Sequence, residues 1–235
     1  MPALTLDAAG VTVATADGER VLLEPTTLSL TEQRVAVIGA NGSGKSTMAR
    51  LLNGLVTPTT GRVLVDGLDV ARHGAEVRRR VGFCFTDPAA QLVMPTCVED
   101  VELSLRRSER DPVARRRRAL EVLERHGLAE HAHQSVHDLS GGQRQLLALA
   151  GVLATDPEVV VADEPTTLLD LANSRRVGDL LLSLPQQLVL LTHDLDLAAR
   201  CDRVLVVEGG RVVADGTGPE SVAAYVDAVD RARLT

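Results

Sequence analysis

Aromatic residues are almost missing from this 235-residue sequence, which has two phenylalanines, one tyrosine and no tryptophan. Proteins that bind single-stranded nucleic acid stack bases on aromatic side chains. The net charge of −7 also gives no general attraction for a phosphate backbone. We therefore expect no nucleic-acid partner.

Cysteines and long apolar runs are also scarce. The three cysteines, Cys84, Cys97 and Cys201, are scattered and form no CxxC pair, which is typical of reduced thiols in a cytosolic protein. The longest apolar run is nine residues, 146–154, whereas a membrane-spanning helix needs about 20. The first residues have neither the basic nor the apolar region of a signal peptide. We expect a protein that stays outside the bilayer.

The pattern along the chain predicts an α/β fold in one domain over residues 1–235. Apolar and polar residues alternate over the first thirty, which favours antiparallel strands. Three continuous apolar runs, 34–38, 159–162 and 187–191, are typical of strands buried on both faces of a parallel sheet. A hairpin over 204–214 and a short helix close the chain. Between 86 and 156 the strand signal disappears and helical spacing dominates. We predict a catalytic core over 1–85 and 157–235, which includes the antiparallel part, and a helical subdomain over 86–156.

A glycine-rich segment after the first continuous apolar run matches G-x-x-x-x-G-K-[ST] and precedes a predicted helix over 45–55. Glycines let consecutive N–H groups curl around phosphate oxygens, and the helix N-terminus favours negative charge. Lys45 is expected to reach the β- and γ-phosphates, and the Ser46 hydroxyl to ligate Mg²⁺. The predicted phosphate-binding residues are Gly39, Ala40, Asn41, Gly42, Ser43, Gly44, Lys45, Ser46 and Thr47.

Two adjacent carboxylates, Asp163 and Glu164, end the second continuous apolar run. Adjacent residues at a strand end point in different directions, so the two acids can take different roles. Beside a phosphate loop, Asp163 is placed to hold Mg²⁺ and Glu164 to polarise the attacking water.

The segment Ser140-Gly141-Gly142-Gln143 precedes a second apolar helix, and Ser140 is a good N-cap. A phosphate loop, then Leu-Ser-Gly-Gly-Gln, then an apolar strand ending in Asp-Glu is the order found in ATP-binding cassette (ABC) ATPases. The chain resembles this family over essentially its whole length. The resemblance implies a P-loop NTPase fold with a RecA-like mixed sheet, an antiparallel N-terminal part and an inserted helical signature subdomain.

The resemblance also implies how the site works. Two cassettes pack head to tail, with ATP and Mg²⁺ between the phosphate loop of one and Ser140–Gln143 of the other. His193 resembles the switch histidine that contacts the γ-phosphate and orients the catalytic Glu164. Asp170 resembles the D-loop aspartate at the dimer seam, although Leu168 replaces the usual small residue before the Leu-Asp pair.

The sequence departs from the family at two places. Thr86 stands where the Q-loop normally carries a glutamine that touches Mg²⁺. A water could restore that contact, or Gln91 or Asp87 could substitute for the missing glutamine. In addition, residues 11–15 lack the aromatic that usually stacks on adenine, so we expect loose base recognition and acceptance of GTP.

The chain carries none of the insertions of the DNA-repair or translation relatives, which favours transport. Residues 87–101 resemble the ATPases of energy-coupling-factor (ECF) importers, and Gln91-Leu92-Val93-Met94-Pro95-Thr96 looks most like the biotin importer, with cobalt or nickel importers as the alternative. The implied partners are a second ABC ATPase subunit, identical or not, an integral membrane coupling subunit and a substrate-binding membrane subunit. The implied location is the cytoplasmic face of the cell membrane. The open alternative is a regulatory ATP-binding protein with weak hydrolysis.

A basic run, Arg115 to Arg118, lies on a predicted helix. The ordinary interpretation is a solvated helix face. The other is a docking contact with the membrane subunit or lipid headgroups.

Overall fold

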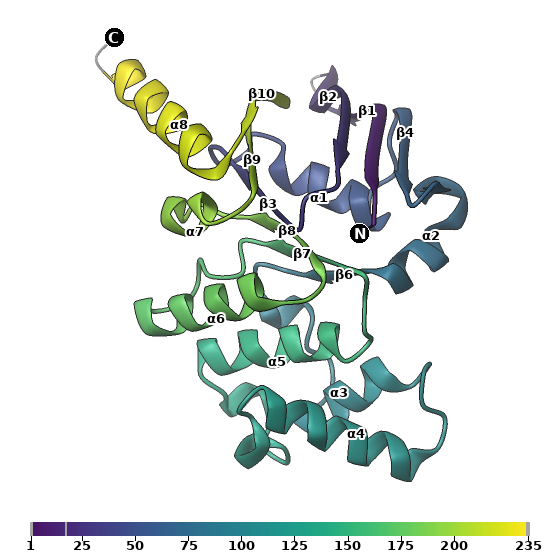
Figure 1. Cartoon of the computed structure of the whole chain (residues 1–235). Helices are drawn as coiled ribbons and strands as arrows, with labels where there is room; N and C mark the ends of the chain where they lie inside the picture. Colours follow the sequence, from purple (N-terminus) through teal and green to yellow (C-terminus); the bar gives the residue numbers. More distant parts are fainter. Residues whose placement is uncertain (1, 17, 234–235) are drawn as a thin grey trace.

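The computed structural model describes residues 2–16 and 18–233 and contains two sheets with helices packed around them (Figure 1). The strands are β1 (Leu4–Thr15), β2 (Gly18–Leu30), β3 (Arg34–Ile38), β4 (Thr60–Val65), β5 (Leu68–Asp69), β6 (Val81–Cys84), β7 (Val159–Asp163), β8 (Gln187–Leu191), β9 (Arg203–Glu208) and β10 (Arg211–Gly216). The α-helices are α1 (Lys45–Asn53), α2 (Val70–Arg80), α3 (Cys97–Leu105), α4 (Pro112–Arg125), α5 (Gly141–Leu153), α6 (Leu171–Ser183), α7 (Leu195–Ala199) and α8 (Gly218–Arg233). The short 3₁₀ helices are η1 (Pro88–Ala90), η2 (Ala129–His131) and η3 (Val136–Asp138).

The larger sheet is mixed, with the order β10-β9-β3-β8-β7-β6. Its strands β9, β3, β8, β7 and β6 pair in parallel, and β10 pairs antiparallel with β9. Each of β3, β7 and β8 is buried at every position, which explains why their sequences are apolar except for one terminal residue each, Arg34, Asp163 and Gln187. The predicted α/β fold with a mixed sheet is confirmed.

Alternate residues of the central strands belong to two different cores. Val35 and Val37 of β3 pack in the core that holds α1 and the antiparallel sheet. Ala36 and Ile38 pack in the core that holds α3, α4, α5 and α6. The sheet therefore has a covered layer on each side, because successive strand residues point to opposite faces.

The smaller sheet is antiparallel, with the order β2-β1-β4-β5. It pairs β1 with both β2 and β4, and β-bulges interrupt both registers. Leu4 and Leu6 of β1 are fully buried against the α1 side of the large sheet. The alternation in the first thirty residues thus correctly indicated an antiparallel N-terminal part.

The described residues between 86 and 156 contain helices and turns but no named strand. In Figure 1, α3 and α4 lie together at the end of the molecule opposite α8, and α5 lies between them and the large sheet. Capping follows the sequence: Thr96 with Glu99, and Ser140 with Gln143, form capping boxes at the starts of α3 and α5.

Three helices were not predicted, and one was predicted too short. The Arg-rich α2 has few apolar residues, and only Val70 and Val77 of it are buried. The helices α6 and α7 were also not recognised, and the closing helix α8 runs for 16 residues. Within the described ranges, no helix is both long enough and apolar enough to span a membrane.

Candidate functional site

The phosphate loop joins β3 to α1 and is held tightly against the antiparallel sheet. Gly44 adopts a φ of 108°, and a Cβ there would lie 2.6 Å from the carbonyl oxygen of Leu22 in β2. Only glycine tolerates both that backbone conformation and that approach. The loop therefore has its shape because β2 lies directly behind it.

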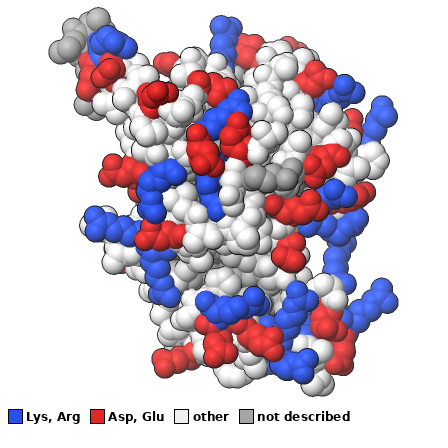
Figure 2. Space-filling view, viewed as in Figure 1, with Lys and Arg blue, Asp and Glu red and all other residues white. Residues whose placement is uncertain are grey.

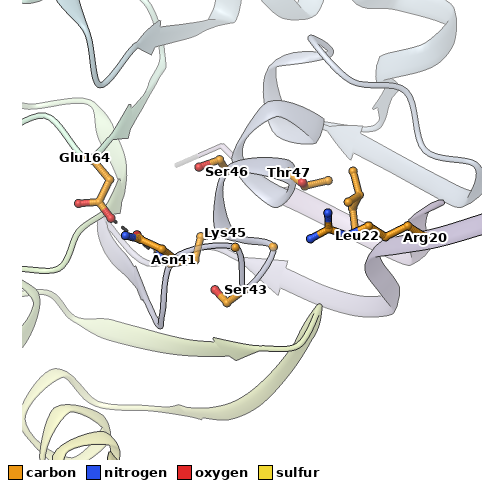
Figure 3. A pocket seen from close by; sticks show the side chains of 10 residues that line it. Arg20, Leu22, Asn41, Ser43, Lys45, Ser46, Thr47 and Glu164 are labelled. Atoms are coloured by element: carbon orange, nitrogen blue, oxygen red, sulfur yellow. Dashed lines mark ion pairs between the residues drawn. The ribbon is translucent and has the colours of Figure 1, made fainter. Parts of the chain in front are cut away.

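The loop forms the floor of an open pocket of about 220 Å³ (Figure 3). The pocket is lined by Arg20, Leu22, Asn41, Gly42, Ser43, Gly44, Lys45, Ser46, Thr47 and Glu164. Seven of the predicted phosphate-binding residues thus line one hollow together with the predicted catalytic acid. The Ser43 hydroxyl is buried without a hydrogen-bond partner, and burying such a group is costly unless a ligand or water satisfies it.

The two remaining loop residues, Gly39 and Ala40, hold the lysine. Lys45 Nζ donates to their carbonyl oxygens at 2.7 and 3.1 Å and lies 3.9 Å from Glu164 Oε1. Burial lowers the pKa of Lys45, and the carboxylates of Glu164 and Asp163 partly offset that effect. The ammonium is thus positioned at the pocket wall by fixed acceptors.

Asp163 lies at the end of β7 between two hydroxyls. Ser46 Oγ donates to Asp163 Oδ1 at 3.0 Å, and Thr86 Oγ1 donates to the Asp163 carbonyl oxygen at 2.8 Å. Burial raises the pKa of Asp163, although the Ser46 hydrogen bond and Arg50 oppose the rise. A buried carboxylate with adjacent hydroxyl oxygens is the set of hard oxygen donors that Mg²⁺ prefers.

Glu164 directly follows β7 and has a φ of 53°, an uncommon conformation for a residue with a side chain. Its Oε2 accepts hydrogen bonds from the His193 backbone N–H at 3.2 Å and the Thr167 hydroxyl at 3.0 Å. Its Oε1 is buried without a hydrogen-bond partner. One carboxylate oxygen is therefore anchored by hydrogen bonds, whereas the other lies beside Lys45 Nζ without a hydrogen bond of its own.

His193 follows β8 and points toward the loop. Its Nε2 lies 2.8 Å from Asn41 Oδ1 and 3.0 Å from Glu164 Oε1. A single Nε2–H can serve only one acceptor well, and the hydrogen-bond geometry is met toward Asn41. This arrangement leaves Oε1 of Glu164 without a hydrogen bond, although the ring and the Lys45 ammonium lie beside it.

Of the three candidates for the Q-loop contact, only Thr86 touches the Asp163 strand end. Gln91 is used elsewhere: its Oε1 accepts from the Phe85 N–H, and its Nε2 donates to the Ala148 carbonyl. Asp87 is exposed and accepts from the Ala89 N–H at the start of η1.

The residues Ser140–Gln143 do not line the loop pocket of their own chain. The Ser140 N–H donates to Gln143 Oε1 at 2.8 Å, and the Gln143 N–H donates to Ser140 Oγ at 3.3 Å. The Gln143 amide nitrogen also lies 2.9 Å from Nε2 of His131. The start of α5 is therefore a rigid helix N-terminus with an exposed serine.

Asp170 likewise lies outside the pocket, where it caps α6. It accepts from the Asn173 N–H and from the Asn173 side-chain nitrogen, and these hydrogen bonds lower its pKa. Leu168 and Leu171 on either side of it are 63% and 67% exposed. A Cβ on Gly141 would lie 3.7 Å from the Leu168 carbonyl, so the D-loop and the start of α5 form one surface.

Sequence reasoning missed three residues of this site. Arg20 and Leu22 form the β2 wall of the pocket, whereas the family pattern predicts the base contact within residues 11–15. Thr167 fixes Glu164, and no sequence pattern marked it. Such contacts arise from strand pairing and loop packing, which residue spacing does not reveal.

The basic run of α4 is engaged within the chain. Arg116 pairs with Glu102 at 3.1 Å, and Arg117 lies 3.8 Å from Glu121. Arg115 and Arg118 donate to backbone carbonyls. On the face drawn in Figure 2, basic and acidic side chains are interspersed.

Comparison with known proteins places the chain in a family. The profile described as ABC transporter matches residues 23–167, more than half of the chain. The biotin transport ATP-binding protein BioM of Rhizobium etli is 45% identical over 88% of this chain and 92% of its own length. The energy-coupling factor transporter ATP-binding protein EcfA1 of Symbiobacterium thermophilum is 42% identical, over 85% of this chain and 71% of that protein.

Solved structures agree with this assignment. The ATP-binding cassette MJ0796, in a dimeric post-hydrolysis state bound to ADP and Pi, has a TM-score of 0.83 and 30% identity, and the match covers 91% of this chain and 98% of that one. CbiO1 from Clostridium perfringens, part of the transporter complex cbiONQ, has a TM-score of 0.80 and 30% identity, over 98% and 94% of the two chains. This chain belongs to the ABC transporter family, as an ATP-binding and ATP-hydrolysing subunit. The alternative of a regulatory, non-transport protein is not favoured.

Proposed function

We propose that this chain hydrolyses Mg²⁺-ATP in a head-to-tail dimer and thereby energises an ECF-type importer. The observation that carries the catalytic part is the state of Glu164. Its Oε2 is anchored by His193 and Thr167, while its buried Oε1 has no hydrogen bond and lies beside Lys45 Nζ and His193 Nε2, and Glu164 lines the phosphate-loop pocket. A carboxylate oxygen in that position can accept a proton from an attacking water molecule.

The residues of the pocket fit a nucleotide triphosphate and its cation. Lys45, the unpaired Ser43 hydroxyl and the loop amides would hold the phosphates. Ser46 and Asp163 would hold Mg²⁺ with the Thr86 hydroxyl nearby, and the bound ion would neutralise charge on the phosphate oxygens.

In the hydrolytic step, we assign proton acceptance to Glu164 Oε1 and positioning to His193. The His193 backbone N–H holds Oε2, and its ring, beside both Asn41 and Oε1, is placed to contact the γ-phosphate. Lys45 would stabilise charge on the phosphate oxygens, because an ammonium in a mostly buried site interacts strongly with developing charge.

A second copy of the cassette is supported by the separation of the two predicted nucleotide-binding surfaces. Ser140–Gln143 do not line the loop pocket of their own chain, so a second cassette would have to supply them. The exposed Leu168 and Leu171 beside Asp170 offer apolar surface for that contact. Family membership supports the same arrangement, since MJ0796 is described as dimeric.

For the membrane partner, we propose a helix of a coupling subunit in a hollow beside residues 86–100. That hollow, about 280 Å³, includes Phe83 and Phe85 from the β6 region, Ser104 of α3, and Gly151 and Val152 of α5. It therefore joins the catalytic sheet to the helical part, so a shift between them would reach a helix seated there. The chain would lie on the cytoplasmic face of the membrane.

The proposed cargo is biotin, supported by the likeness to BioM, with cobalt or nickel ions as the alternative. The cargo does not contact this subunit in such a system, so the pocket cannot distinguish them. Uptake of radiolabelled biotin, Co²⁺ and Ni²⁺ by liposomes containing the chain and its membrane subunits tests this. Uptake of metal ions without biotin would refute biotin as the cargo.

The catalytic proposal is tested by ATPase activity and gel filtration of Glu164→Gln in ATP and Mg²⁺. Glu158→Gln is the matched control, because Glu158 lies just before β7, half exposed, while Glu164 lies just after it. We expect hydrolysis to fall about 100-fold or more in Glu164→Gln, with an ATP-held dimer accumulating, and no change in the control. Full hydrolysis by Glu164→Gln would refute the role of Glu164.

A further inference from the structure

We propose that Arg20 binds the nucleotide base by stacking its guanidinium plane on the ring. This inference rests on the proposed function, since it assigns the base end of a nucleotide whose phosphates lie on the loop. Arg20 lines the same pocket as Lys45 and Glu164, but it comes from β2 of the antiparallel sheet rather than from the catalytic core.

The position of Arg20 is fixed by the strand next to the loop. Leu22 is pressed against Gly44, and the Glu24 N–H donates to the Gly210 carbonyl at 2.8 Å. Arg20 precedes a β-bulge at Leu22, where the register with β1 shifts, and both side chains line the pocket. Figure 3 shows the Arg20 side chain extending from β2 toward the loop, with its nitrogen atoms on the pocket side near Thr47.

The two basic side chains of the pocket, Lys45 and Arg20, lie at different ends of it. Lys45, with Ser43 and Ser46, lies at the loop, where phosphate oxygens would be held. Arg20 lies on the opposite wall beside the apolar Leu22. A flat apolar ring with polar edges fits a wall made of a leucine and a guanidinium, because arginine stacks on aromatic faces.

No phenylalanine or tyrosine of the described residues lines the pocket to stack on the base. The three aromatic residues of the sequence are Phe83, Phe85 and Tyr225, and none of them lines the pocket. Phe83 and Phe85 pack on each other with ring centroids 4.7 Å apart, and Tyr225 belongs to α8. Arg20 is thus the side chain of the pocket whose flat cationic group can cover a base.

Stacking has a consequence for specificity. Every base has a π-face, so a stacked guanidinium binds adenine and guanine alike without reading their edges. We therefore expect ATP and GTP to bind with dissociation constants within about threefold of each other, whereas inorganic tripolyphosphate, which lacks a base, gains nothing from Arg20.

The test measures binding of ATP and of tripolyphosphate, with Mg²⁺, to the purified full chain by calorimetry. Arg20→Ala is expected to weaken ATP binding about tenfold and to leave tripolyphosphate binding unchanged. Arg20→Tyr, which keeps a plane and loses the charge, is expected to retain ATP affinity. Arg20→Lys, which keeps the charge and loses the plane, is expected to behave like Arg20→Ala.

Arg72→Ala is the charge-matched control, because Arg72 is highly exposed on α2, away from the pocket. Equal weakening of ATP and tripolyphosphate in Arg20→Ala, or retention of affinity by Arg20→Lys but not Arg20→Tyr, would show a phosphate contact and overturn the inference alone. If the wild-type chain bound neither probe, the proposed function and the inference would both fail.

Discussion

Alanine substitutions at Gly141 and Gly142 should differ in their effect on stability, although the two glycines are neighbours at the start of α5. A Cβ on Gly141 would lie 3.7 Å from its nearest neighbour, the Leu168 carbonyl, which is ordinary contact. A Cβ on Gly142 would lie 2.4 Å from Cγ and 2.6 Å from Oδ1 of Asn173. The space that a Cβ on Gly142 would need is already occupied by the side-chain amide of Asn173, which lies on α6.

The expected magnitudes follow from those contacts. Replacing glycine by alanine in a helix favours folding by roughly 0.5–1 kcal/mol, so Gly141→Ala should be neutral or stabilising. In Gly142→Ala, the Asn173 side chain must turn away and lose its bond from Nδ2 to Asp170, which is 2.8 Å long. Losing that bond costs about 0.5–1.5 kcal/mol, and because Asn173 is only partly buried its amide can turn away, so the loss offsets the gain from propensity and leaves Gly142→Ala less stable than Gly141→Ala.

Thermal unfolding without nucleotide measures the difference. For a chain of this length, 1 kcal/mol shifts Tm by about 2–4 °C, so Gly142→Ala should unfold about 2–4 °C below Gly141→Ala, which should unfold at or above the wild type. The double variant Gly142→Ala/Asn173→Ala should be close to Asn173→Ala alone, because the blocking amide is gone.

Equal Tm values for the two alanine variants would refute this account. So would a double variant whose losses simply add, since additivity would show that Asn173 is not the group in the way.

Three further outcomes are expected. Burial raises the pKa of the Cys84 thiol from 9.0 to about 12. At pH 8 this lowers the fraction of reactive thiolate about a thousandfold. Alkylation followed by mass spectrometry should therefore label Cys84 only after the protein is unfolded. Arg203→Met should lower the free energy of unfolding by about 1–2 kcal/mol at pH 7, because Arg203 pairs with Glu32 at 3.1 Å and is four-fifths buried. Burial pushes the pKa of Glu32 up, but backbone hydrogen bonds and Arg203 outweigh it and leave that pKa below 4.5. The part of the contribution that comes from Glu32 is therefore present above about pH 4.5 and lost as pH falls through the lowered pKa. Arg203 also donates to Asp215 and to the Ser29 carbonyl, so the difference between wild type and variant in urea titrations should shrink in acid without vanishing, and a difference that does not change with pH would contradict the pairing. Thr86→Val should lower the free energy of unfolding by about 1 kcal/mol and reduce Mg²⁺-dependent hydrolysis, because it removes the hydroxyl that donates to the Asp163 carbonyl. Thr86→Ser, which keeps a hydroxyl, should retain wild-type stability and hydrolysis. Equal activity of the two variants would exclude a role for the hydroxyl.

The large sheet was predictable because its strands are buried on both faces. That environment favours runs of four consecutive apolar residues, such as those within β3, β7 and β8. The helix α2 was not predictable in the same way. It contributes only Val70 and Val77 to the core, and its position depends on β5 and β6, which flank it in the chain, and on β4, all of which contact it.

The sequence by itself determined the local chemistry of this protein. The loop from Gly39 to Thr47, the Asp163-Glu164 pair and the Ser140 cap are each made of consecutive residues, so their geometry follows from short-range backbone and capping rules. The tertiary structure alone decided which groups meet. Pairing of β6 with β7 brings Thr86 to Asp163 across 77 positions, and packing of β2 behind the loop brings Arg20 to the pocket. These contacts depend on strand register and loop closure over long separations, which no local pattern encodes.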